Sequence, residues 1–294
     1  MKKFFKTVLI ATLFFSCGSD KKQENSADNS TDKQPQQFNI SILLDLSDRI
    51  DDENHPEQRE RDIQIVSAII DIFKNKMQTD GAFLSKSKMQ ILFSPAPADP
   101  NVNNIAKNLS VDLSKVDNKK KKEIFDNIEK DFEDGLKEIY QLTLQNKKWI
   151  GSDIWRFFKY DANELCIDKN PSCRNILVIV TDGYLYHIQS KDRQLNRTAF
   201  INERYLQSEG LRTPNWKDKF ERGDYGFINT GQTFENLEVM VLGINPSNKH
   251  TNDEDIIRAY IGKWFDELKI KNKVLYNTDL PTNTQKRIEN FFKD

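Results

Sequence analysis

The sequence is poor in three residue types that mark special architectures. Its 294 residues include only 3 Cys, 11 Gly and 9 Pro. These numbers exclude a collagen-like repeat and a small scaffold held together by many disulfides. Lysine and arginine number 44 against 45 for aspartate and glutamate, so the formal net charge is −1. Because the chain lacks the basic excess that neutralises phosphates, we expect no nucleic-acid partner.

Apolar runs long enough to cross a membrane are also absent. The N-terminal run, residues 7–15, is far below the ~20 residues that a transmembrane helix needs. It follows the basic segment 1–6 and leads into Ser16-Cys17-Gly18. This order is typical of an export signal that is not part of the fold.

A small residue, a cysteine and a glycine at the end of such a run resemble a bacterial lipobox. The resemblance implies that residues 1–16 are a lipoprotein signal peptide and that Cys17 carries the lipid (palmitate) and becomes the mature N-terminus. The chain is then anchored to a membrane of the bacterial cell envelope, on its periplasmic or surface side. An ordinary secretory peptide cut nearby is the alternative.

Residues 17–37 form the expected tether between this anchor and the fold. From Gly18 to Gln37 there is no aromatic or branched aliphatic residue, so the segment cannot bury enough apolar area to order itself. Twenty flexible residues have a root-mean-square reach of about 25 Å. We therefore expect the folded body to lie just above the membrane surface.

Two further cysteines, Cys166 and Cys173, are seven residues apart on either side of the turn signal Asn-Pro-Ser. In an oxidising compartment the spacing favours a disulfide across the turn, which would stabilise the fold by about 2–3 kcal/mol. Two free thiols are the alternative. Zinc is disfavoured, since no further Cys or nearby His completes four ligands.

From residue 38 onward, apolar runs alternate with segments of helical periodicity. The expected strands are residues 38–45, 89–93, 109–113, 175–181, 237–244 and 273–276. The expected helices are a segment opened by Pro56 and residues 119–144, 154–158, 253–268 and 282–292. Runs as apolar as 175–181 and 237–244 indicate central parallel strands buried on both faces. We predict an α/β fold, a doubly wound and mostly parallel sheet with helices on both faces, over residues 38–294.

The interval 184–236 separates the two most apolar strands. It is long, polar and rich in aromatic residues. A plain crossover between parallel strands does not need this length, so we predict an insertion here.

Three short polar clusters follow the ends of expected elements. They are Asp45-Leu46-Ser47-Asp48-Arg49, Gly151-Ser152-Asp153 and Thr181-Asp182-Gly183. In an open α/β sheet the carboxyl ends of the strands form the binding face, so these loops should meet there. Each cluster by itself fits a helix entry, a helix cap or a plain turn.

Together and in this order, the clusters resemble the von Willebrand factor type A (VWA) family. The resemblance matches Asp45 and Ser47 to the family's Asp-x-Ser-x-Ser motif, Ser152 to its second loop and Asp182 to its third. It implies a metal-ion-dependent adhesion site in which these four residues hold Mg²⁺ or Mn²⁺. An all-oxygen set of ligands suits hard divalent cations.

The second serine of the family motif is Arg49 in this chain. An inward guanidinium ~5 Å from a dication would be repelled by about 6–7 kcal/mol at an effective dielectric of ~20. Three arrangements remain open: Arg49 opposes the metal, acidic neighbours such as Asp48 draw it outward, or it replaces the metal beside Asp45 and Asp182. Asp48, Arg49 and Asp153 are thus candidate modulators, and the metal site is either occupied or a relic.

The resemblance implies a non-enzymatic binding or scaffold module that contacts a protein partner through the strand-end face. The alternative is a metal-dependent phosphohydrolase of haloacid dehalogenase type, with Asp45 and Thr181 at strand ends. That chemistry wants a second carboxylate two residues after the first, where Ser47 stands. Among the three histidines, His187 is the one expected near the site.

Overall fold

The computed structural model describes residues 36–51, 57–81, 83–146, 148–246 and 250–293. The predicted signal peptide and the predicted lipid-carrying Cys17 lie outside these residues. A six-stranded sheet has the order β3-β2-β1-β4-β8-β9. Its strands are β1 (Gln37–Leu44), β2 (Lys88–Leu92), β3 (Val111–Asp112), β4 (Cys173–Val180), β8 (Leu237–Ile244) and β9 (Lys273–Asn277). Only β3 pairs antiparallel, so the predicted α/β fold with a mostly parallel sheet is confirmed.

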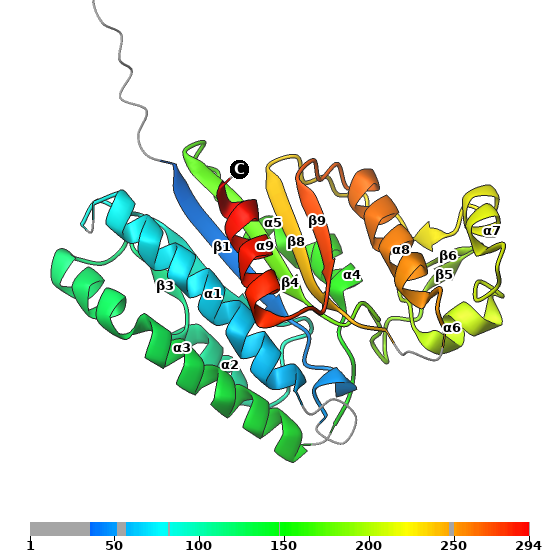
Figure 1. Cartoon of the computed structure of the whole chain (residues 1–294), viewed down its shortest axis with the longest axis horizontal. Helices are drawn as coiled ribbons and strands as arrows, with labels where there is room; N and C mark the ends of the chain where they lie inside the picture. Colours follow the sequence, from blue (N-terminus) through cyan, green and yellow to red (C-terminus); the bar gives the residue numbers. More distant parts are fainter. Residues whose placement is uncertain (1–35, 52–56, 82, 147, 247–249, 294) are drawn as a thin grey trace, which may run out of the picture. The chain divides into compact units, whose positions relative to one another are not determined.

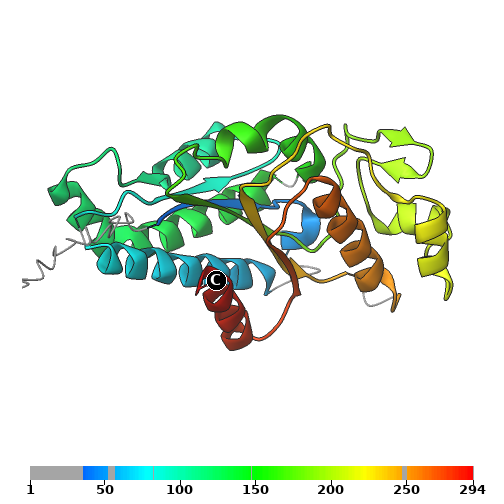
Figure 2. The same cartoon turned by 90° about the horizontal axis from the view of Figure 1, so that it is seen from above.

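Helices cover both faces of this sheet (Figure 2). On one face lie α1 (Gln58–Thr79), α3 (Asn118–Asn146) and α9 (Pro281–Lys293). On the other lie α4 (Ile154–Arg156), the π-helical turn η2 (Phe157–Asp161), α5 (Ala162–Leu165) and α8 (Asp253–Glu267). Alternate residues of β4 supply the two cores, Ile176 and Val178 on one face and Leu177 and Ile179 on the other. Burial on both faces explains why the strand is continuously apolar.

Outside the insertion, one separate α-helix of the described chain was not among those expected from the sequence. Helix α2 (Pro100–Asn108) follows β2, in an interval to which the sequence analysis assigned no element. Asp99 caps it by accepting the backbone N–H of Asn101, and Pro100 occupies its first turn. Both residues are standard helix starts, so the signal was present beside the proline-rich stretch.

The interval between β4 and β8 holds small elements that gather beside α8 (Figure 1). They are β5 (Arg193–Gln194), β6 (Arg197–Thr198), α6 (Glu203–Ser208), α7 (Trp216–Arg222) and β7 (Gly226–Phe227). Aromatic contacts hold them to α8: the Phe227 and Tyr260 rings are 5.7 Å apart, and the Tyr205 and Tyr260 hydroxyls 3.1 Å. A T-shaped aromatic pair adds about 0.5–1.5 kcal/mol to the area it buries, so the insertion is well supported.

The predicted disulfide is not formed, and both thiols are free in the structure. Cys173 pairs with Gln37 in the β1–β4 register. Cys166 lies farther along β1: its carbonyl accepts the Asn39 amide, and its thiol is hydrogen-bonded to Ser41. Along β1, the position of Cys173 and that of Cys166 are thus two to four residues apart, a distance of about 7–13 Å. Bridged cysteines usually have Cα atoms within ~7 Å, so the cysteines do not meet across the turn.

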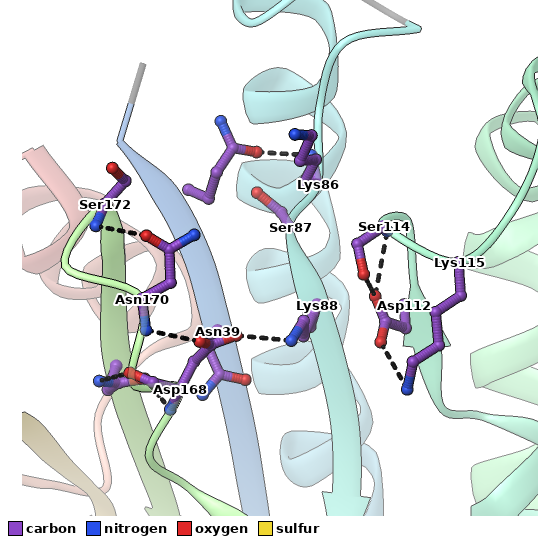
Figure 3. A network of polar contacts seen from close by, with 12 residues as sticks. Asn39, Lys86, Ser87, Lys88, Asp112, Ser114, Lys115, Asp168, Asn170 and Ser172 are labelled. Carbon is purple, nitrogen blue, oxygen red and sulfur yellow. Dashed lines mark hydrogen bonds and ion pairs between the residues drawn. The ribbon is translucent and has the colours of Figure 1, made fainter. Parts of the chain in front are cut away.

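The amino ends of β1, β2 and β4 carry a separate polar network (Figure 3). Asn39 donates to the Asn175 side chain at 2.8 Å, and the Lys88 ammonium reaches Asp168 at 2.5 Å.

Within the described part of the chain, no helix is both long and apolar enough to cross a membrane.

Candidate functional site

The site is built at the carboxyl ends of β1 and β4. Leu44 and Val180 pair at the end of the two strands, so Asp45 and Thr181 leave the sheet side by side. The Thr181 hydroxyl donates to one Asp45 carboxylate oxygen at 2.7 Å, and the Ser47 backbone N–H donates to the other at 2.9 Å. Asp45 has no exposed surface. Its carboxylate therefore joins the two loops through hydrogen bonds in the interior of the protein.

Arg49 points inward, from the short 3-10 turn η1 (Asp48–Ile50). Its Nε donates to the Asp45 carbonyl at 2.9 Å and lies 3.9 Å from the Asp45 carboxylate. Its two terminal nitrogens reach both oxygens of Asp62, at 2.6 and 3.3 Å. Burial alone would lower the pKa of Arg49, but Asp62 and Asp45 outweigh burial and raise it. The guanidinium is thus a fixed positive charge under the strand ends.

The partner of Arg49 comes from helix α1 and was missed in the sequence. Asp62 is fully buried and also accepts the Tyr140 hydroxyl at 2.8 Å and the Gln58 amide at 2.9 Å. Burial and Asp62 raise the pKa of Tyr140, so its hydroxyl keeps the proton it donates. Asp62 precedes Val66 by four residues, within the buried stripe of α1. A charge in such a stripe is the signal that could have revealed it, since buried carboxylates are nearly always paired.

Asp182 is the second carboxylate of the site. It accepts the Tyr184 backbone N–H at 2.9 Å. Burial, and then the negative charge of Asp45, raise the pKa of Asp182 to about 7, while Arg49 opposes the rise. Two carboxylates close together resist ionising together, so near neutral pH Asp182 is protonated in part of the molecules.

The second of the predicted loops, Gly151-Ser152-Asp153, joins the site through the insertion. The Ser152 backbone N–H donates to the Tyr186 carbonyl at 2.8 Å, and Gly151 bridges to His187. The Ser152 hydroxyl, however, lies 3.4 Å from the Ser94 carbonyl, its one hydrogen-bond acceptor in the described structure. Gly151 lines the same cleft as Ser47 and Asp182. The loop is therefore at the site, with its serine turned to the backbone.

Asp153 has a structural position behind this loop. It caps α4 by accepting the Arg156 backbone N–H at 3.1 Å, and it accepts the Ser190 hydroxyl. The His187 ring nitrogen Nδ1 lies 3.5 Å from the same carboxylate. Burial lowers the pKa of His187, with a smaller opposing effect of Asp153. These contacts fasten the start of the insertion to the site.

The loops and the insertion enclose an open cleft of about 940 Å³. Its lining includes Ser47, Asp48, Arg49, Gly151 and Asp182 from the strand ends and Tyr184, Tyr186, Lys191, Arg193, Phe200, Arg204 and Tyr205 from the insertion. Arg193 is paired with Glu209. Lys191 and Arg204 are exposed and have no carboxylate partner among the described residues. The cleft thus offers aromatic surface and two cations without a carboxylate partner in the described part of the chain.

The donor set does not fit a divalent cation in this arrangement. Both oxygens of Asp45 already accept hydrogen bonds, and Arg49 lies 3.9 Å from its carboxylate. No group of three or more His, Cys, Asp or Glu side chains suited to a metal occurs among the described residues. The observed position of Arg49 is nearest to the arrangement in which it stands beside Asp45 in place of a metal. Its main partner, however, is Asp62 and not Asp182.

Comparisons with known proteins give no family. No protein-family model matches the sequence, and no curated protein is significantly similar to it. Among solved structures, proximal thread matrix protein 1 from the mussel byssus is 11% identical with a TM-score of 0.39, covering 87% of this chain and 47% of that one. The pilus adhesin SpaC from Lactobacillus rhamnosus GG, in an open conformation, is 11% identical with a TM-score of 0.40, covering 88% and 30%. This chain spans less than half the length of either protein.

Proposed function

We propose that this chain is a membrane-anchored, VWA-like binding module that contacts a protein partner through its strand-end cleft. One observation carries the proposal. The loops after β1 and β4 and the insertion, far apart in sequence, enclose one cleft with Arg49 and Asp182 at its base. Ligands of open α/β sheets bind at this edge.

The charges of the cleft indicate the chemistry of the partner. Lys191 and Arg204 are exposed and have no carboxylate partner in the described structure, and Lys191 lies over the Tyr186 ring. Among the carboxylates of the lining, Asp48 is exposed and Glu203 is partly exposed, and Glu203 lies 3.5 Å from Arg212. Tyr186 and Phe200 add aromatic surface, with ring centroids 5.8 Å apart. Aromatic and arginine side chains dominate the energy of protein interfaces. The partner therefore presents an acidic segment with apolar neighbours.

Photo-crosslinking in the native envelope tests the proposal. A photoreactive residue at Tyr186 should give one discrete adduct with a protein. Charge reversal by Lys191→Glu with Arg204→Glu should abolish that adduct. Lys217→Glu on α7, a matched exposed lysine outside the cleft, should leave it unchanged. Equal adduct yield in all three proteins would refute a role for the cleft.

Within this proposal, Arg49 supplies the positive charge that the family resemblance assigns to a metal. Titration of Mn²⁺ into the wild type should then show no micromolar binding. Arg49→Ser restores the missing hydroxyl and removes the repulsion, and should raise Mn²⁺ affinity. Micromolar binding by the wild type that Asp182→Ala abolishes would overturn the role given to Arg49.

The phosphohydrolase alternative lacks a supporting observation. Asp45 would have to attack phosphorus, yet it is fully buried and both its oxygens accept hydrogen bonds. Ser47 occupies the place where that reaction needs a proton-carrying carboxylate. A phosphatase screen with and without Mg²⁺ separates the two functions directly.

A further inference from the structure

The opposite end of the sheet, where β1, β2 and β4 begin, carries exposed apolar side chains. Phe83 and Leu84, in the loop before β2, are 51% and 72% exposed. Large apolar side chains are normally scattered singly over a surface. Here two successive residues are exposed, in a loop whose carbonyls contact Lys121 in a run of four lysines at the start of α3.

The lysines beside this loop are largely unpaired. Lys86 lies in the loop itself, and Lys119 and Lys122 lie at the start of α3. All three are exposed and have no carboxylate partner within the described structure, and the first turn of α3 contains no acidic residue. The surface therefore has local positive charge although the whole chain is nearly neutral.

Lys121 fixes the loop to α3. Its ammonium is buried and donates to the carbonyls of Phe83 and Ser85, both at 2.8 Å. Burial, and then the neighbouring charge of Lys86, lower the pKa of Lys121. The loop that carries the two apolar side chains is thus fixed to the start of α3, where the lysines lie.

This surface also lies where the tether enters the fold. Gln37, the first residue of β1, accepts the Lys86 backbone N–H at 2.5 Å, and its own N–H donates to the Ser172 carbonyl at 2.8 Å. Figure 3 shows Lys86 and Ser172 at this end of the sheet. Cys17, the expected site of the lipid anchor, precedes Gln37 by twenty residues.

We propose that Phe83, Leu84, Lys86, Lys119 and Lys122 form a membrane-docking patch that rests on the anionic bilayer surface to which the tether holds the chain. The proposal goes beyond the strand-end cleft and depends only on the N-terminal anchor. Each lysine near an anionic bilayer is worth about a fivefold gain in binding. A tether makes the contact intramolecular, with an effective concentration in the millimolar range, so a weak patch suffices.

Docking would also orient the cleft. The patch lies at the amino end of β1, and the cleft lies at its carboxyl end, eight residues away. At ~3.3 Å per residue the two are about 25 Å apart along the strand. A chain resting on this patch points its cleft away from the bilayer, towards a partner in the envelope.

Hydrogen exchange of the full chain on vesicles tests the proposal. Vesicles of phosphatidylcholine alone are compared with vesicles that also contain phosphatidylglycerol. Flotation with both kinds reports the anchor, and exchange within residues 83–87 and 118–122 reports docking. We expect slower exchange there on the anionic vesicles only, and loss of that protection at high salt, since screening shortens the reach of the charges.

Two variants and a control make the result specific. Lys119→Glu with Lys122→Glu should cut the docked-to-free ratio at least 25-fold, a fivefold loss for each lysine. Phe83→Ser with Leu84→Ser should abolish protection on the same vesicles, and Lys217→Glu should retain it. All substituted side chains are exposed, so the fold is preserved. Equal exchange on both vesicles, or protection unchanged in the two variants, would overturn the docking patch.

Discussion

Each end of the central sheet holds a buried arginine, but the carboxylate partners of the two arginines differ in exposure. At the amino ends, Arg174 is 7% exposed; it forms a two-point pair with Glu238, at 2.6 and 2.7 Å, and donates to the carbonyls of Phe291 and Phe292. At the carboxyl ends, Asp45, Asp62 and Asp182 surround the buried guanidinium of Arg49. The amino-end pair reaches water through Glu238, whose side chain is 21% exposed, whereas the side chains of Arg49, Asp45 and Asp62 are at most 1% exposed and depend on one another. We expect the loss of one partner to cost more at the carboxyl ends, because it leaves a fully buried charge without compensation.

Removing Arg49 should have the largest effect of any single change. Arg49→Met leaves Asp45 and Asp62 buried without a counter-charge, which costs about 3–5 kcal/mol. The free energy of unfolding in urea measures the loss. Arg61→Met, which removes an exposed pair with Glu57, should cost at most about 1 kcal/mol. Adding Asp62→Leu to Arg49→Met should recover part of the loss, and a loss below that of Arg61→Met would contradict the central role of Arg49.

We expect the second-largest loss of stability from a change at the contact between the insertion and the site. At Gly151, which has a φ of +90°, an added Cβ would lie 1.9 Å from the Tyr186 carbonyl oxygen. Gly151→Ala must therefore move the insertion away from the Ser152 loop, and we expect it to lower stability by about 2–4 kcal/mol.

Gly231 provides the matched control for this change. Its φ is +75°, but an added Cβ would meet nothing within 4 Å. Gly231→Ala should cost only the left-handed backbone strain, about 1–2 kcal/mol. Urea unfolding of both variants gives the difference, and equal losses would show that the close approach at Gly151 is unimportant.

The same comparison explains how much of the fold could be predicted. Strands β1, β4 and β8 are buried on both faces, so their apolar runs were visible in the sequence and the sheet was predicted nearly to its ends. Strands β5, β6 and β7 have two residues each, too few for a periodicity, and they exist because α8 supports them.

The site was predictable only where strand ends determine it. Asp45 and Asp182 follow adjacent parallel strands, so their proximity follows from the sheet order. The direction of Arg49 could not be predicted, because its partner Asp62 comes from a helix packed across the core, and Tyr140 from another. Side-chain direction there depends on tertiary packing, which neither periodicity nor spacing contains.

The raised pKa of Asp182 should produce a smaller, pH-dependent effect. The folded chain holds this proton up to about pH 7, whereas an unfolded Asp loses it near pH 4. Between these values the folded state binds more protons, so stability falls as pH rises, by at most about 1.4 kcal/mol per pH unit, and the loss is complete above about pH 7.

Asp182→Asn isolates this contribution. The variant lacks the titrating group, so its stability relative to wild type should rise from about pH 4 to about pH 7 and then stay level. Unfolding midpoints of both proteins across that range measure the difference. A constant difference would show that Asp182 titrates near its ordinary value.

The cysteines at the amino end should give the smallest effect, because no bond joins them. Cys173 is half-buried, and Cys166 is buried, which raises its pKa to about 12. Only the thiolate reacts with iodoacetamide, so the folded chain should be labelled slowly at Cys173 and not at Cys166, and both should react after unfolding without reductant. Reductant should leave the unfolding midpoint unchanged, whereas breaking a disulfide of this loop length would cost about 2–3 kcal/mol. The opposite result would come from chain purified from an oxidising envelope, if neither thiol reacted after unfolding until reductant was added. That result would support the disulfide prediction and would require the amino end of β4 to rearrange.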